Sequence, residues 1–297
     1  MAGLVETLKG MKFSKTFLNA FAGNTTELAA FSTSFNSDAA VRGNKIRVPF
    51  YGLGTVKDWD RDTGYEFDDM NVDAPEITLD QRSYLPIALS SEDLQNMPEV
   101  DISKAATGYG AQLANSFTRN VLSAVNKANF ANVMTGITEA TFDYDSLIDI
   151  KTKCDTLETM PNAGRFLVLR YEAYNALLRD RTIVNNGVPR TWQNIIDGKV
   201  EPIAGFTVLP SLSLPAGVTG FACMADALLV GSRVIKPDAN DIEFEQFNDP
   251  ASGLTIAYKR AYNFQMDQGQ YIWESSYGKQ VGDSSKAVRL ISAATDA

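Results

Sequence analysis

The sequence predicts an α+β fold with one unusually long helix and no repeated strand–helix–strand units. Residues 101–134 contain no proline, and their apolar residues recur every three to four positions, which is the period of an amphipathic helix. Residues 254–264 follow a turn-forming segment at 248–253 and place apolar or aromatic residues at alternate positions, which is typical of a strand. The other expected helices and strands do not alternate as in a parallel-sheet enzyme.

The composition is that of a folded protein. The 297 residues are 44% hydrophobic and 21% charged, which is enough to bury a substantial core in one or two domains. The net charge of -9 argues against a surface built as a whole to hold nucleic-acid phosphates, while a local basic patch stays open. Residues 1–12 lack the apolar run of a signal peptide, and no stretch is apolar enough to span a membrane. We therefore expect a soluble protein that is made in the cytoplasm.

The sequence also lacks the residues of common catalytic sites. There is no histidine, which excludes Ser-His-Asp, Cys-His and His-zinc sites. The glycine pairs Gly52/Gly54 and Gly108/Gly110 are isolated and belong to no phosphate-binding motif. We therefore assign no catalytic, cofactor-binding or metal-binding residue, and we expect neither an enzyme nor a bound cofactor.

One acidic segment resembles a calcium-binding loop. Asp58, Asp60 and Asp62 alternate, and Asp69 stands at the twelfth position, but Thr63 occupies the sixth position, where such loops need glycine. Strands are expected on both sides instead of helices. We interpret the segment as a solvated acidic loop and leave open whether Asp58, Asp60 and Asp62 bind a cation.

The two cysteines have no expected chemical role. Cys154 falls in a predicted helix and Cys223 in an apolar, strand-like stretch, so each is interpreted as a small core residue. Two cysteines are also too few for a disulfide-stapled secreted protein. The carboxylate pairs 68–69 and 92–93 are interpreted as solvated surface.

Residues 1–44 are rich in Ser, Thr, Asn and Ala, with a short helix predicted at 15–22. Because their aromatic residues are isolated and unevenly spaced, we expect them to bury little surface within their own chain. The segment therefore suits an arm that packs on something else, and deletion of residues 1–40 should leave a folded subunit. The aromatic residues are Phe13, Phe17, Phe21, Phe31 and Phe35.

Two strands are predicted at 45–48 and 76–89, and Pro86 indicates that the second lies at a sheet edge. About two dozen polar, acidic and glycine-containing residues separate them, and a loop of that length usually has a function. We interpret this region as a long two-stranded projection.

The long helix is expected to cross a flat, extended molecule. A capping-box-like start at 90–93 begins a shorter helix, which Pro98 ends. An unbroken helix over 101–134 would be about 50 Å long, with Gly108 and Gly110 as points where it could break. Its apolar stripe should face the core, with Phe117 buried.

The remaining chain is expected to be mixed. Helices are predicted at 144–160 and 171–179, with a glycine-bearing loop around 185–187. Strands are predicted at 165–170, 206–209 and 242–247, and residues 225–230 form a helix or a strand.

The order of these elements resembles the Hong Kong 97-like major capsid fold of tailed bacteriophages and herpesviruses. Three local stretches carry the resemblance besides that order: 165–178, 203–230 and 247–278. The resemblance implies an N-terminal arm at 1–44, an E-loop at 45–88 and a P domain with the spine helix at 89–134. It also implies an A domain at 135–240 and returning strands at 241–297 that complete both domains.

The function that the resemblance implies is that of a major capsid protein. Such a protein assembles with itself, as hexamers and pentamers, into the icosahedral shell that encloses the double-stranded DNA of a tailed phage. Implied partners are scaffolding and portal proteins, a decoration protein, and packaged DNA that is contacted weakly; no membrane is implied. One family member crosslinks its subunits through a lysine and an asparagine. Here Lys57 is the one lysine in the projecting part of the E-loop, with Lys45 at its base, and we interpret it as a solvated lysine.

Two alternatives stay open. The first is an encapsulin, a cellular compartment with the same fold that holds a cargo enzyme, although the long arm and E-loop favour the virus. A histidine-free, carboxylate-based hydrolase is the alternative from another class, and it lacks a recognisable pocket motif.

Overall fold

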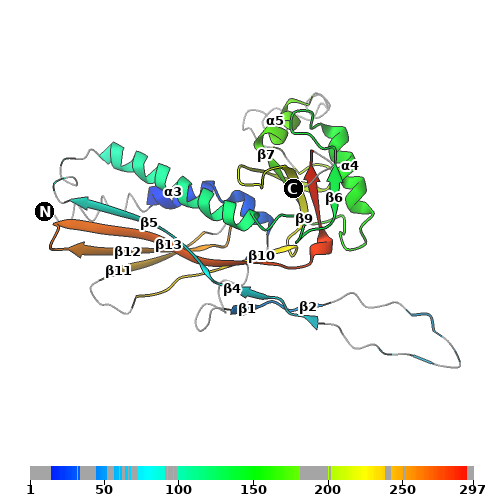
Figure 1. The fold of residues 1–297 in the computed structure, drawn as a ribbon, viewed down its shortest axis with the longest axis horizontal. Coiled ribbons are helices and arrows are strands. Elements are labelled where there is room, and N and C mark those ends of the chain that lie inside the picture. Colours follow the sequence, from blue (N-terminus) through cyan, green and yellow to red (C-terminus); the bar gives the residue numbers. More distant parts are fainter. Residues whose placement is uncertain are drawn as a thin grey trace.

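A computed structural model of the chain describes residues 15–31, 33, 45–51, 57–59, 61, 64–65, 67, 72–90, 92, 96, 99–180, 200, 202–237, 242–249 and 252–292. The molecule is elongated, with a helix-covered sheet at one end, a rounder mixed part at the other, and a narrow ribbon that projects below them (Figure 1). Phe13, Phe35 and the loop predicted around 185–187 lie outside the described residues. None of the described helices is long and apolar enough to cross a membrane.

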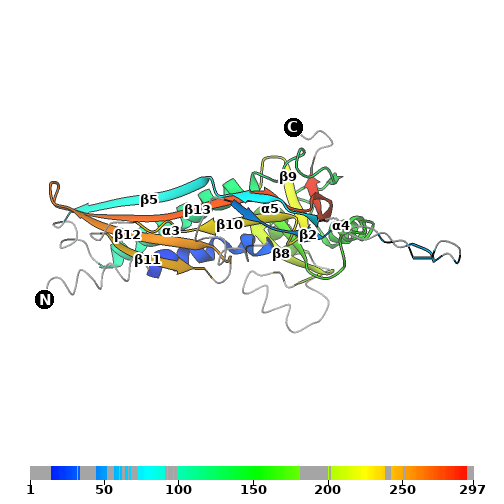
Figure 2. The same ribbon diagram turned by 90° about the horizontal axis from the view of Figure 1, so that it is seen from below.

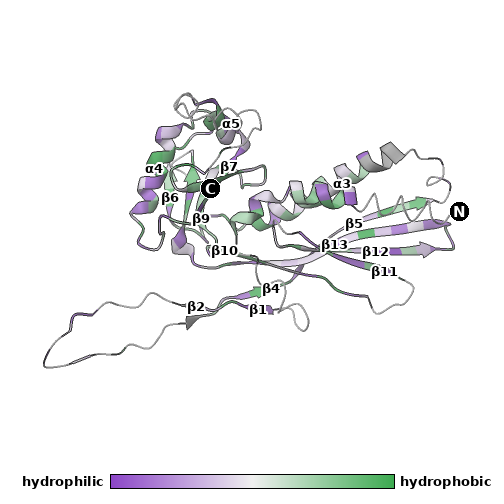
Figure 3. Cartoon of the chain, turned by 180° about the vertical axis from the view of Figure 1, so that it is seen from behind, coloured by the Kyte–Doolittle hydropathy of each residue, from purple (hydrophilic) through white to green (hydrophobic). Residues whose placement is uncertain are grey.

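The long helix is α3 (Glu99–Leu122), and it is continuous through Gly108 and Gly110. Its 24 residues correspond to about 36 Å, shorter than the length expected from residues 101–134. Phe117 is buried as predicted, whereas Tyr109 is partly exposed. Hydrophobic and hydrophilic residues are interspersed along the helix (Figure 3), and its buried residues belong to one core cluster with those of the sheet below it. The other buried positions of this predicted stripe include Ala106, Leu113 and Val121.

The predicted continuation of α3 to residue 134 is wrong, because polar side chains take over the backbone groups at its end. The Ser123 hydroxyl donates to the Asn120 carbonyl oxygen over 2.7 Å, and the Asn129 amide donates to the Ala124 carbonyl oxygen over 2.8 Å. The ammonium of Lys279 also donates to the Asn120 carbonyl oxygen. Such side-chain bonds compete with helical ones and end the helix, and a positive charge there suits the negative end of the helix dipole.

An antiparallel sheet, which we call the spine sheet, lies under α3. β13 (Gln268–Val281) is its central strand and pairs over residues 268–274 with β5 (Gln81–Ser90) on one side and β12 (Thr255–Asn263) on the other. β11 (Glu243–Asn248) and β10 (Leu228–Arg233) complete the sheet. In the described chain β5 pairs only with β13, so it is an edge strand, and the prediction drawn from Pro86 is confirmed.

The strand predicted at 76–89 is two strands. β4 (Glu76–Thr78) turns away from β5 and pairs with β1 (Lys45–Arg47), while β3 (Val72–Asp73) pairs with β2 (Phe50–Tyr51). These short pairs form the base of the projecting ribbon (Figures 1 and 2).

A second sheet contains both parallel and antiparallel strands, and we call it the mixed sheet. Its strand order is β6 (Val133–Thr135), β14 (Ala287–Ile291), β9 (Val218–Met224), β7 (Arg165–Arg170) and β8 (Phe206–Ser211). The helices α4 (Tyr144–Asp155) and α5 (Tyr171–Arg179) pack on one face, and the 3₁₀ turn η2 (Ser284–Lys286) precedes β14. The other face joins the core under α3. Burial on both faces explains why β7 and β9 are almost continuously apolar.

Two boundaries of this part differ from the sequence prediction. α4 ends at Asp155 instead of residue 160, and β8 continues through Pro210 to Ser211. β8 tolerates the proline because, among the described strands, it pairs only with β7 at the edge of the sheet. The segment predicted as helix or strand at 225–230 contributes to the strand β10.

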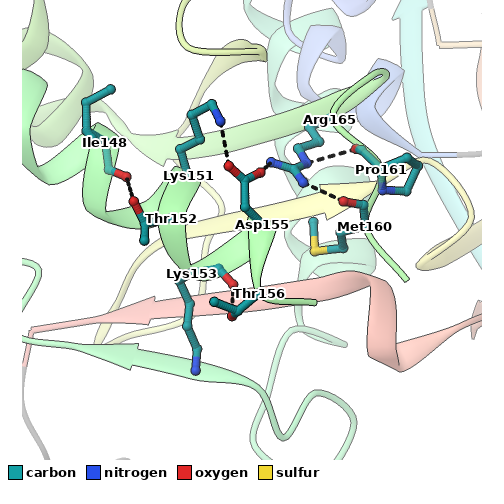
Figure 4. A network of polar contacts seen from close by, with 9 residues as sticks. All are labelled: Ile148, Lys151, Thr152, Lys153, Asp155, Thr156, Met160, Pro161 and Arg165. Carbon is teal, nitrogen blue, oxygen red and sulfur yellow. Dashed lines mark hydrogen bonds and ion pairs between the residues drawn. The ribbon is translucent and has the colours of Figure 1, made fainter. Parts of the chain in front are cut away.

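A buried arginine organises the end of α4 (Figure 4). The Arg165 guanidinium donates to Asp155 Oδ1 over 2.5 Å and to the backbone carbonyl oxygens of Met160 and Pro161. Hydrogen bonds from Lys151 and then Arg165 hold the pKa of Asp155 below its usual value. Its partners make this buried charge tolerable, and they fix the loop that connects α4 to β7.

The N-terminal segment 15–31, which we call the strap, is part of the core. It forms the helix predicted at 15–22, which continues to residue 23, and the 3₁₀ turn η1 (Thr26–Ala30). Phe17, Phe21 and Phe31 are all buried, and the Phe17 ring stacks on Trp273 with 4.8 Å between ring centroids. The expectation that these aromatics bury little within their own chain is therefore wrong, because β13 and β9 supply the surfaces that local spacing does not reveal.

Candidate assembly surfaces

The ribbon is anchored at its base by charge and by a small apolar core. Glu76 of β4 accepts from Lys45 Nζ over 2.8 Å and pairs with Arg47 of β1 over 2.6 Å. Hydrogen bonds from these two side chains lower the pKa of Glu76. Ile46 of β1 and Ile77 of β4 pack against Leu229 of β10. The base therefore lies in a fixed position on the spine sheet.

Beyond its base the ribbon presents aromatic side chains to solvent. Phe67 is 93% exposed, and Trp59 and Tyr65 are also largely exposed. The sequence around them, residues 57–69, carries six acidic residues and two basic ones. Large exposed aromatics in an acidic loop are typical of a surface that a partner covers.

The outer face of the spine sheet carries a charged cluster across three strands. Glu274 of β13 is almost fully buried, and its carboxylate accepts from Arg82 of β5 and from Lys259 of β12. Tyr84 stands opposite Glu274 in the register of β5 and β13 and is 61% exposed. The cluster places two cations beside an exposed aromatic ring on a face away from α3.

The turn between β12 and β13 forms a second exposed apolar tip. Phe264 is 88% exposed, and its ring meets Tyr262 edge-on at 4.9 Å between centroids. The Tyr262 hydroxyl donates to Asp267 Oδ1, which fixes the ring, and Met266 is exposed beside it. The tip lies at the end of the long axis opposite the ribbon (Figure 2).

The solvent side of α3 contains a polar hollow of about 750 Å³. Among the described residues, its lining is mostly amides, hydroxyls and small residues, and the charged side chain in it is that of Arg119. The described residues that line it are Gly108, Ala111, Gln112, Asn115, Ser116, Arg119, Asn120 and Ser123.

The acidic loop considered for calcium is only partly described. Asp58 is exposed, whereas Asp60, Asp62 and Asp69 lie outside the described residues, so a cation there stays untested. Within the described part of the chain, no group of three or more His, Cys, Asp or Glu side chains is placed to hold a metal ion. Lys57 is described and exposed, and Lys45 is paired with Glu76.

Both cysteines are buried and unbridged, as predicted for core residues. Burial raises the pKa of the Cys154 thiol to about 11, and burial also raises the pKa of Cys223 far above its usual value. A thiol that stays protonated is a poor nucleophile.

Sequence reasoning missed the charged cluster at Glu274 and the tip at Phe264. The cluster joins residues of three strands, and nothing in the local sequence aligns them. A signal for the tip was present, because the alternation of 254–264 ends on an aromatic residue next to the turn at Gln265 and Met266.

Comparison with known proteins identifies the fold. No protein-family model matches the sequence, and no curated protein sequence does so. Solved structures do match. A structure from Mycobacterium phage Che8 superposes with a TM-score of 0.57 at 17% identity, covering 88% of this chain and 89% of that one. The capsid structure of cyanophage P-SCSP1u gives 0.56 at 16% identity, covering 86% and 85% of the two chains.

The chain has the Hong Kong 97-like capsid fold. The virus-like particle from Pyrococcus furiosus also superposes, with a TM-score of 0.54 at 11% identity, covering 93% of this chain and 96% of that one. The α+β Hong Kong 97-like fold predicted from the sequence is confirmed. The domain boundaries drawn from the resemblance stay predictions.

Proposed function

We propose that this chain is the major capsid protein of a tailed bacteriophage, a subunit that assembles into the icosahedral shell around double-stranded DNA. The observation that carries the proposal is the ribbon with its exposed aromatics, on a subunit with the Hong Kong 97-like fold. The same residues support a structural role over catalysis, because the exposed groups are apolar and aromatic.

The ribbon leaves its aromatics uncovered, since Trp59, Tyr65 and Phe67 are largely exposed while the base of the ribbon is fixed on the spine sheet. A neighbouring copy can cover them. A head-to-tail contact of this kind repeats around a ring and closes it, which is how hexamers and pentamers form. Each such interface then needs about 1,200–2,000 Å² of buried surface to be stable.

The outer face of the spine sheet is the surface that we propose for the neighbour's ribbon. Arg82 and Lys259 share the single negative charge of Glu274, which leaves this cluster net positive, and residues 57–69 are predominantly acidic, so the two surfaces have complementary charges. Exposed Tyr84 adds an aromatic surface for Phe67 or Trp59.

We also propose a revised domain division. β5 lies within the expected E-loop range 45–88 but pairs with β13 along its whole length. The projection is therefore better assigned to residues 45–79, with β5 in the P domain together with α3. Residues 1–44 are better divided at 31, because the strap belongs to the subunit core.

Other partners follow from the proposed role. Scaffolding and portal proteins would act during assembly in the host cytoplasm, a decoration protein would bind the outside, and DNA would be contacted weakly. The mature protein would reside in the virion.

The second candidate is an encapsulin, a cellular shell that encloses a cargo enzyme. The structural match to the virus-like particle from Pyrococcus furiosus supports this candidate. Both candidates predict closed shells. They differ in content, because a phage shell takes up DNA through a portal, whereas an encapsulin encloses a folded cargo protein.

Sedimentation and electron microscopy of the purified chain test the proposal. We expect closed shells, and a chain that remains monomeric at all concentrations and salt conditions would contradict a shell role. Particles isolated from the native source would then contain either DNA or a cargo enzyme, which separates the two candidates.

The variant Phe67→Ser tests the surface itself. It should fold like the parent but fail to form shells, because it removes only exposed surface. Leu212→Ser is the matched control, since Leu212 is also a largely exposed apolar residue but lies outside the ribbon. Shells from Phe67→Ser at the parental yield would remove the ribbon from the assembly interface.

A further inference from the structure

The strap connects the two sheets of the subunit. Its helix packs Phe17 on Trp273 of the spine sheet, and Phe31 at its other end packs against Phe221 of the mixed sheet, with 6.4 Å between ring centroids. Thr25 between them donates to Asp249 Oδ2 over 3.2 Å. The strap therefore couples the position of one sheet to that of the other.

A carboxyl group is buried where the strap meets β8. Glu27 lies in η1 and is 6% exposed, and its carboxyl group is hydrogen-bonded to Ser211 and Ser213. The Ser211 hydroxyl oxygen accepts from the backbone N–H of Ser213 over 3.0 Å, which leaves its own hydrogen available for Glu27. The contact is thus built from one acid and two hydroxyls.

The described cations near this contact are held by other partners. η1 packs against β7 and β8, and β8 has no ionisable residue. On β7, Arg165 binds Asp155, while Arg170 binds Glu139 and three backbone carbonyl groups. Tyr171 of α5 also faces Glu27, and its pKa is raised by burial and then by the charge of Glu27. Among the described residues, the groups that face the Glu27 carboxyl are therefore the hydroxyls of Ser211, Ser213 and Tyr171.

Burial without a cation favours the neutral acid. It raises the pKa of Glu27 from 4.5 to about 7, outweighing the two serine hydrogen bonds, which act in the opposite direction. A released strap would return this pKa to its ordinary value. Docking is therefore most stable when pH is below the released pKa, and it weakens as pH rises through the docked pKa.

We propose that Glu27 is a proton-sensitive latch, which holds η1 against the end of β8 while its carboxyl is protonated and loosens this contact when it ionises. The latch belongs to the single subunit and does not rest on the proposed function. It gives the chain a way to change the coupling between its two sheets near neutral pH without breaking either sheet.

Hydrogen exchange of the full-length chain measures the latch directly. The backbone N–H groups of Leu28 and Phe31 donate within the strap over 3.0 and 3.1 Å, so their protection reports docking of η1. After correction for the intrinsic pH dependence of exchange, protection should fall about 30-fold between about pH 5.5 and pH 8.5, given the two pKa values. Amides of β13 should show no such fall.

Three variants test the cause. Glu27→Gln keeps the shape of the neutral acid but cannot ionise, so its protection should not change with pH. Glu172→Gln, at an exposed acid of α5, should behave like the parent. Ser213→Ala removes a hydrogen bond that lowers the Glu27 pKa, so the midpoint of the fall should move to higher pH.

The outcomes that overturn the latch are equally direct. They are a flat pH profile in the parent, or the same fall in Glu27→Gln as in the parent. If Glu27→Gln does not fold, the Ser213→Ala variant tests the proposal instead. A midpoint of its fall in protection that is unchanged, or that moves to lower pH, rejects the proposal.

Discussion

Gly231 and Gly278 lie directly opposite each other in the neighbouring strands β10 and β13. A methyl group at Gly278 would collide with the carbonyl oxygen of Thr78, and one at Gly231 would lie 3.0 Å from the end of Ile46. The pair therefore leaves a bare strip of backbone on which the base of the ribbon lies. This strip is what permits β4 to cross the spine sheet so closely.

Gly278→Ala should displace β4 and destabilise the subunit by about 1–3 kcal/mol, as overpacking does. Gly231→Ala is the graded control, because it meets the ends of flexible side chains instead of backbone. Urea unfolding compares the two. Equal stability of Gly278→Ala and the parent would mean that the ribbon does not lie on this strip.

Two glycines of α3 should respond in opposite directions. A methyl group at Gly110 would lie 2.5 Å from the Phe17 carbonyl oxygen, whereas one at Gly108 would meet open space. Gly108→Ala should stabilise the helix by up to about 1 kcal/mol, and Gly110→Ala should lower stability. Thermal unfolding of both variants checks this, and a stabilising Gly110→Ala would place the strap elsewhere.

Phe17→Ala should cost about 3–5 kcal/mol, because it removes a fully buried ring that stacks on Trp273. Asn19→Ala, at an exposed position of the same helix, should be nearly neutral. Deletion of residues 1–40 should accordingly give an unfolded or insoluble chain. Circular dichroism and solubility measure both effects, and a folded deletion variant would argue for an independent arm.

Phe117→Asp should abolish the cooperative melt, since it buries a charge against Tyr277, whose ring centroid lies 3.9 Å from that of Phe117. Ser116→Asp is the control on the exposed side of α3. The two variants differ by one position, so their contrast reports the helix register. Similar melting of both would show that the register is wrong.

Unassembled subunits should bind duplex DNA weakly and without sequence preference. The chain carries 36 Asp and Glu against 27 Lys and Arg, and under the proposed function packaged DNA has to move during filling and release. A titration at about 150 mM salt should give dissociation constants no tighter than the ordinary non-specific range of about 10⁻⁴ to 10⁻⁶ M. Submicromolar binding that discriminates between sequences would indicate a nucleic-acid-handling role.

The local sequence pattern was sufficient to predict an element wherever the spacing of its own apolar residues determines its structure. β7, α5 and the buried face of α3 were all predictable, because apolar spacing alone decides which side is buried. The end of α3 was not, since the local bonds of Ser123 and Asn129 are joined there by one from Lys279, which approaches from β13.

The candidate assembly surfaces likewise include one that the sequence predicts and one that it does not. The exposed ribbon could be anticipated from the length and acidity of residues 45–79. The cluster at Glu274 could not, because Arg82 and Lys259 come from strands that only the tertiary fold brings together. The burial of the strap was hidden for the same reason, as Phe17 meets Trp273 from the far end of the chain.

The pairing of early and late segments also determines when the subunit can fold. During synthesis β5 has no partner until residues 268–281 have left the ribosome, and Thr25 meets Asp249 across 224 positions of chain. Contacts this distant in sequence make folding slow. The nascent chain therefore holds no finished spine sheet on which another copy could dock. Under the proposed function, a chain is able to receive a neighbour's ribbon only after β13 is complete.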